Sequence, residues 1–94
     1  MESSDKIIIT VSGADKVGIV AKVATLLANN QVNIEDIKQT LMQGHFVMFM
    51  LCSIAKTDKT LQELQTVLKE ECTKMDMEVW VQRKEIFDNM HSIS

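Results

Sequence analysis

The most constraining feature of this sequence is the stretch from His45 to Ala55, in which nearly every side chain is apolar. Its length fits a single strand, and both of its alternating rows are hydrophobic. One row holds Val47, Phe49 and Leu51, and the other holds Phe46, Met48, Met50 and Cys52. A strand that is apolar on both faces is central in its sheet and covered on both sides. The chain is therefore expected to fold into layers around this segment.

Two segments before this central run predict a strand followed by a helix. Residues 6–12 are β-branched and alternate, which favours a strand. A turn of small residues leads to residues 19–28, where apolar side chains recur at helical spacing. Asp15 is a candidate N-cap for this helix, and Asn29-Asn30 is expected to supply its left-handed stop.

The segment 32–43 is ambiguous, because its apolar residues suit either a strand or one face of a helix. We interpret it as a second strand, which leads through a turn at Gln43-Gly44 into the central run. In a regular strand Ile34 and Ile37 would point to opposite faces, so this interpretation requires a bulge or a twist between them.

After the central run, the pattern predicts a second helix, a further strand and a docked C-terminal segment. Thr60 and Glu63 form a capping-box pattern, and an apolar stripe continues from there to about Lys74. Residues 77–83 alternate as a strand. Residues 85–94 carry apolar side chains at helical spacing, which indicates a short docked turn or helix rather than a loose tail.

The order of these elements, β-α-β-β-α-β, is the split βαβ or ferredoxin-like arrangement, an α+β fold. We expect a single domain over residues 1–94, with a short C-terminal appendage. Right-handed crossovers place both helices on one face of a four-stranded antiparallel sheet, with the first and third strands in the middle.

The other face of such a sheet is left bare, and the sequence indicates that it is apolar. It would carry Ile8, Trp80 and one row of the central run, for which Met48 and Met50 are predicted. Because 46% of the 94 residues are hydrophobic, this is more apolar surface than a soluble monomer leaves in water. A second copy of the chain is the simplest cover, so a homodimer is expected.

Composition excludes several classes of function. A net charge of −3 and a single arginine, Arg83, argue against a nucleic-acid binder, which would cluster basic residues on one face. No apolar run approaches the ~20 residues of a membrane span, and no secretory segment opens the chain. Cys52 and Cys72 are too few and too far apart for a disulfide framework, so a cytoplasmic protein with reduced thiols is expected.

No arrangement of residues predicts an enzyme, a metal site or a cofactor. Both cysteines fall inside predicted elements, where buried packing is expected. His45 and His91 have no Ser, Cys or carboxylate at a spacing typical of catalysis. What remains is the loop 13–18, because the helix start after it presents free amides suited to an anion. The same residues also suit a well-capped tight turn.

The segment from Asp15 to Ile37 resembles the signature of the ACT domain, a small regulatory module that binds amino acids. The pattern is an acidic residue, a glycine, an apolar helix ending and an Asn-Ile strand, here Asp15, Gly18, Leu26, Leu27, Ala28, Asn33 and Ile34. The stretches 15–20, 33–40 and 86–91 are more specifically similar to small standalone prokaryotic ACT proteins of the glycine-cleavage-repressor-like group. Many ACT loops have proline where this chain has Val17.

The resemblance implies a site shared between two subunits, with the effector between the first loop of one and the second strand of the other. Carried over by position, the loop side is Asp15, Lys16, Val17, Gly18 and Ile19, and the strand side is Asn33 and Ile34. Amides near Gly18 and Ile19 would hold the carboxylate of an amino acid, and Asp15 or Asn33 its ammonium group.

The implied function is an allosteric homodimer that binds an amino acid and acts on an unknown partner protein. The alternative is an interaction module without a ligand, which uses the bare sheet face and the C-terminal segment to bind a partner directly.

Overall fold

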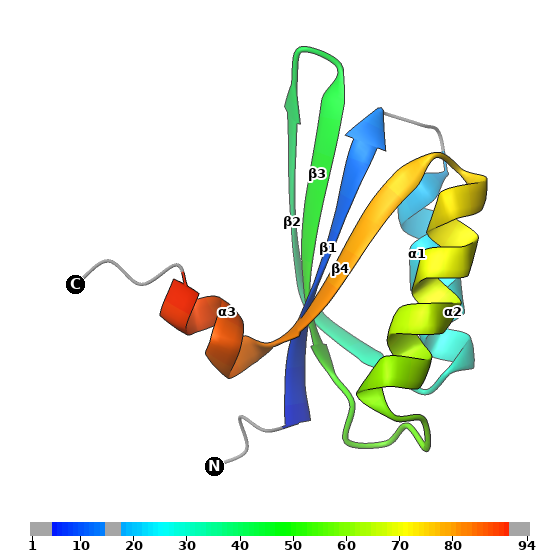
Figure 1. Ribbon diagram of the computed structural model, residues 1–94, viewed down its shortest axis with the longest axis vertical. Helices are drawn as coiled ribbons and strands as arrows, with labels where there is room; N and C mark the ends of the chain where they lie inside the picture. Colours follow the sequence, from blue (N-terminus) through cyan, green and yellow to red (C-terminus); the bar gives the residue numbers. More distant parts are fainter. Residues whose placement is uncertain (1–4, 15–17, 91–94) are drawn as a thin grey trace.

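A computed structural model describes residues 5–14 and 18–90, which form one sheet and three helices. The elements are β1 (Lys6–Ala14), α1 (Ile19–Asn29), β2 (Asn33–Met42), β3 (His45–Ser53), α2 (Leu61–Lys74), β4 (Met77–Arg83) and α3 (Lys84–Met90). Figure 1 shows α1 and α2 on one face of the sheet and α3 on the other side, where β4 ends. The predicted ferredoxin-like order is confirmed.

The strands lie in the order β2-β3-β1-β4, and every neighbouring pair is antiparallel. As predicted, β1 and β3 occupy the middle of the sheet. The two edges of the sheet are therefore β2 and β4, and the central run identified from the sequence is β3.

The core lies between the sheet and the two long helices. It combines one row of each inner strand with the apolar stripe of each helix, including Ile7, Ile9, Val11, Ile19, Val23, Leu27, Met48, Met50, Cys52, Leu64, Leu68 and Cys72. The predicted capping box begins α2: the Glu63 amide donates to Thr60 Oγ1 at 3.1 Å, and the Thr60 amide donates to Glu63 Oε1 at 2.8 Å.

The prediction for the bare face was wrong at Met48 and Met50. Both side chains are 0% exposed and belong to the core beneath the helices. The row of β3 on the open face of the sheet is half-buried and consists of Val47, Phe49 and Leu51. The sequence carried a signal for this, because the outward row has polar ends, His45 and Ser53, whereas the core row is apolar throughout.

The predicted bulge is present in β2. The register shifts by one residue between Ile34 and Asp36, so Glu35 is an extra residue in this strand. As a result, Ile34 and Ile37 both pack against the core. The predicted turn at Gln43-Gly44 joins β2 to β3, and both of its residues have positive φ, 54° and 80°.

The ends of α1 differ from the prediction. The N-cap is Gly18 in the left-handed conformation, whereas the prediction placed Asp15 there; Asp15 lies outside the described residues. At the other end Asn30 has a φ of −106°, and the left-handed residue is Gln31, with a φ of 58°. The Asn30 side chain instead donates to the Leu26 carbonyl at 2.8 Å.

The open face of the sheet is partly covered by α3. Phe87 packs against Phe49 with ring centroids 6.0 Å apart, and α3 contacts β1 and β4. Ile8 is nearly buried on this face, whereas Trp80 is 50% exposed. Of the expected docking segment, residues 85–90 belong to α3 and residues 91–94 lie outside the described residues.

Candidate ligand site

The loop side of the predicted site is the start of α1. Gly18 is exposed, and its φ of 86° is one that glycine adopts without strain. A Cβ built there would meet no atom within 4 Å, so the position demands glycine for its backbone angle and not for lack of space. Ile19 is buried, and the Lys22 amide donates to the Gly18 carbonyl at 2.9 Å. Residues 15–17 lie outside the described residues.

The first turn of α1 has the electrostatics of an anion site. It contains no acidic residue, and among the described residues no side chain accepts from its amides. The positive end of the helix dipole is therefore not offset by a carboxylate of that turn. Its first amides are suited to a carboxylate or a phosphate group.

The strand side lies at the other end of α1. Asn33 is exposed at the start of β2, and Ile34 is half-buried against the core. The surface beside Asn33 forms a groove of about 510 Å³, lined by Ala28, Gln31, Val32, Asn33, Ser53, Ala55 and Lys56. This volume is in the usual range for a small-molecule site, roughly 300–1,000 Å³.

One chain does not bring the two sides together. The 11 residues of α1 separate Gly18 from the segment that leads to Asn33. At about 1.5 Å per residue, the ends of this helix are about 16 Å apart. The two ends of α1 are at opposite ends of the sheet in Figure 1. A ligand the size of an amino acid cannot touch both sides within one protomer.

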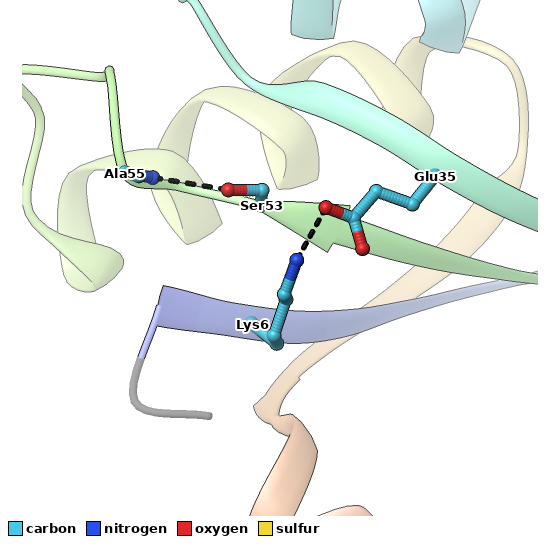
Figure 2. Close-up of polar contacts among 4 residues, drawn as sticks. All are labelled: Lys6, Glu35, Ser53 and Ala55. Carbon is cyan, nitrogen blue, oxygen red and sulfur yellow. Dashed lines mark hydrogen bonds and ion pairs between the residues drawn. The ribbon is translucent and has the colours of Figure 1, made fainter. Parts of the chain in front are cut away.

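An ion pair holds the bulge beside the strand side. Lys6 Nζ of β1 and Glu35 Oε2 of β2 pair with each other, as Figure 2 shows. Ser53 of β3 lies opposite Lys6 of β1 and opposite Asn33 of β2 in the register. Its Oγ accepts from the Ala55 amide at 3.4 Å. These contacts tie the end of the groove to the central strands.

The two thiols are unsuited to chemistry. Burial, with a smaller effect of the Glu35 charge, raises the pKa of Cys52 to about 12. Burial also raises the pKa of Cys72 above its usual value, with a further contribution from Glu71. Both thiols are free and protonated at neutral pH, which makes them poor nucleophiles and poor metal ligands. Within residues 5–14 and 18–90, no three His, Cys, Asp or Glu side chains gather as a metal site would need.

The structure brings together one pair that the sequence reasoning missed. Ser12 Oγ and His45 Nε2 lie 2.8 Å apart on the surface, because β1 and β3 pair Ala14 with His45. The only signal available was the antiparallel register itself. Nucleophilic catalysis needs a third group that orients the histidine, and none bonds this ring within the described part of the chain. His91 lies outside that part.

The two edges of the sheet differ in how open they are. On β4, Gln65 of α2 donates to the Val81 carbonyl at 3.3 Å. On β2, the one side-chain bond to the main chain within the described ranges is local, from the Ile37 amide to Asp36 Oδ1 at 2.9 Å. Further along this strand Leu41 is 57% exposed. The edge of β2 is thus the one with room for another strand.

The βαββαβ order and the glycine-led start of α1 define a small domain of the ACT type. The pattern of the ACT domain family matches residues 5–82. The chain therefore belongs to the ACT domain family, whose fold is a regulatory one, and the resemblance seen in the sequence is confirmed.

Within this family, the chain is similar over nearly its whole length to a UPF0237 protein of Listeria innocua, with 41% identity over 86 residues, 92% of this chain and 97% of that protein. Among solved structures, an ACT domain protein from Streptococcus pneumoniae has a TM-score of 0.77 and 30% identity and covers 95% of this chain and 97% of its own. A putative glycine cleavage system transcriptional repressor shares the fold, with a TM-score of 0.72 and 24% identity over 83% of this chain and 44% of that one.

None of the helices in the described residues has both the length and the apolar character needed to cross a membrane.

Proposed function

We propose that this chain is a cytoplasmic regulatory protein, a homodimer that binds an amino acid between its subunits and passes that state to a partner protein. One observation supports the proposal: the start of α1 and the groove beside Asn33 lie a helix length apart on one chain. A two-fold symmetric pair of protomers is the simplest assembly that joins them.

A two-fold axis perpendicular to the sheet, beside the edge of β2, would complete the site. Such an axis pairs β2 with the same strand of the partner and inverts the partner. The start of α1 in one protomer then lies beside the end of α1 in the other, and Gly18 approaches Asn33 of the partner subunit. The open edge of β2 and the exposed Leu41 support this pairing, which would bury both.

The groups offered by the two sides suit a zwitterion. The amides of Gly18 and Ile19 at the positive end of α1 would bind the carboxylate. The side-chain oxygen of Asn33, or the carboxylate of Asp15, would accept from the ammonium group. The walls of the site would be completed by Lys16, Val17 and Ile34.

A ligand held across the interface couples its own binding to the assembly. It binds the dimer more tightly than the monomer, so it must strengthen the dimer by the same factor. Only this difference in affinity can shift the population that a partner protein meets. The structural basis of the regulation would be the arrangement of the two protomers.

A second candidate is an interaction module that works without a ligand. The observation that favours it is the exposure of Trp80 and Ile86, at 50% and 48%, away from the proposed ligand site. This function does not need the anion site at the start of α1, so the two candidates differ in whether an amino acid binds.

Thermal melting against a panel of free amino acids separates them. For the dimer, we expect at least one amino acid to raise the melting temperature in proportion to the logarithm of its concentration. If no amino acid does so while light scattering shows an assembly of two or more chains, ligand binding is refuted and the interaction module stands.

A matched pair of variants locates the response. Gly18 and Gly44 have φ of 86° and 80°, and a Cβ at either meets nothing within 4 Å, so Gly18→Leu and Gly44→Leu carry the same backbone strain. Both should lose about 1–2 kcal/mol of stability. Only Gly18→Leu should lose the response to the amino acid, and equal loss in both would contradict the assigned site.

A further inference from the structure

Three large hydrophobic side chains are exposed among the described residues: Leu41, Trp80 and Ile86. The proposed pairing of β2 accounts for Leu41. Trp80 lies on β4, at the other edge of the sheet, and Ile86 lies on α3, so neither is part of the β2 edge. Exposed apolar patches rimmed by polar residues are typical of interaction sites.

Trp80 borders a groove on the open face of the sheet, with a volume of about 540 Å³. Its apolar wall is formed by Phe49, Trp80 and Phe87, three of the four aromatic residues in the chain. Gln65 and Lys69 of α2 contribute a polar rim where the groove passes the edge of β4. In the described residues, Lys69 takes part in no ion pair. The groove is thus aromatic within and positive at one side.

The helix α3 uses only one of its two large apolar side chains whose contacts are described. Phe87 packs against Phe49, whereas the neighbouring Ile86 is 48% exposed. The polar residues of α3 beside it are charged: Lys84 Nζ pairs with Asp88 Oδ2 at 2.5 Å, and Glu85 has no ion pair among the described residues. Ile86 and Glu85 together present an apolar side chain next to an unpaired negative charge.

We propose that the open face and α3 form an interface to a second copy of this chain, in which Ile86 of each protomer enters the aromatic groove of the other. The surface can be complementary to itself, because the exposed Ile86 is the chain neighbour of Phe87, which lines the groove. Self-complementarity is what a two-fold interface between identical chains requires. The charges agree as well, since Glu85 would approach Lys69 of the partner subunit.

The geometry of this contact follows from the position of α3. Figure 1 shows α3 beside the end of the sheet where β4 stops, which leaves the rest of that face open. A two-fold axis between two facing sheets and perpendicular to their strands inverts the partner. Its α3 then covers the part of the face that the first α3 leaves open, and the two helices together fill the layer between the sheets.

This interface is separate from the β2 edge, and its existence does not rest on the proposed function. If both contacts form, their two-fold axes are perpendicular. Where such axes meet, the assembly closes at four chains. The expectation of four chains depends on the proposed β2 pairing as well, whereas the expected burial of Trp80 depends only on the contact at the open face.

The single tryptophan of the chain, Trp80, reports directly on this surface. Substituting the exposed Ile86 with Glu should leave the fold unchanged by circular dichroism and shift the fluorescence emission of Trp80 to longer wavelength, because the groove loses its cover. By light scattering the wild type should have the mass of four chains of 10.6 kDa each, and Ile86→Glu should have the mass of two chains. The conservative Ile86→Leu should behave as the wild type does.

Leu41→Glu is the control for the other contact, since Leu41 lies at the β2 edge. It should reduce the mass and the amino-acid response while leaving the emission of Trp80 unchanged. The open-face inference is overturned if Ile86→Glu has the mass and the emission of the wild type. The proposed ligand-binding dimer fails if Leu41→Glu changes neither mass nor response, whatever Trp80 reports.

Discussion

Truncating two adjacent residues of β3, Met50 and Leu51, tests which face of the strand packs into the core. Met50 is 0% exposed and lies between Ile9 of β1 and Ile37 of β2 in the register. Replacing a fully buried methionine by alanine costs about 2–5 kcal/mol, because it removes apolar contact and leaves a cavity. Leu51 is half-buried on the open face. Complete burial of a leucine contributes about 1.5–3 kcal/mol, so Leu51→Ala should cost about 1 kcal/mol.

The measurement is the free energy of unfolding from urea titrations followed by circular dichroism, extrapolated to water. A domain of this kind has about 5–15 kcal/mol of stability in total, so Met50→Ala removes a large share of it. An unchanged slope of free energy against urea is the control for comparable unfolded states. If Leu51→Ala costs as much as Met50→Ala, the assignment of the two rows to their faces is wrong.

Four further substitutions probe the helix cap, the thiol and the first strand. Thr60→Ala removes the cap of α2 and should cost about 1 kcal/mol, which calorimetry would detect as a melting point lowered by about 4–8 °C; Glu63→Gln, which keeps a hydrogen-bonding side chain, should cost less. Folding raises the pKa of Cys52 from 9.0 to about 12, so the folded chain keeps the thiol proton in a pH range in which the unfolded chain has lost it. The free energy of unfolding should therefore fall as the pH rises above 9.0, and it should fall less steeply in Cys52→Ala. Gly13→Ala places a Cβ 2.5 Å from the Met77 sulfur and 3.1 Å from the Asp76 carbonyl oxygen, so urea titration should show a loss of about 1–3 kcal/mol.

Local patterns were sufficient to predict most of the fold. The strand at residues 77–83 and the capped start of α2 were found because alternation and capping act between near neighbours. The bulge in β2 was also predictable, since Ile34 and Ile37 could reach one core only with an extra residue between them. The row of β3 that faces the helices was not, because both rows are apolar and packing partners distant in sequence decide between them.

The sequence supplied candidate residues for the site, which stay a prediction, and it did not supply their geometry. The motif identified Gly18, but the helix start depends on the backbone angle at that residue, which a side-chain pattern does not record. The contact between Ser12 and His45 depends on the register of β1 and β3. The contact between Phe49 and Phe87 depends on how α3 docks on the sheet. Contacts of this kind follow from tertiary structure and have no local signature.

The bulge at Glu35 links the packing of the core to the strand side of the candidate site. One extra residue lets Ile34 and Ile37 pack on the same side of the sheet, and Lys6 holds that residue from β1. Without it, every side chain on one side of the bulge would turn to the opposite face, Asn33 among them. The position of Asn33 is therefore set by the core of its own protomer. In the proposed dimer, a strand side that is already ordered before the partner binds would lower the entropy cost of closing the shared site around a small ligand.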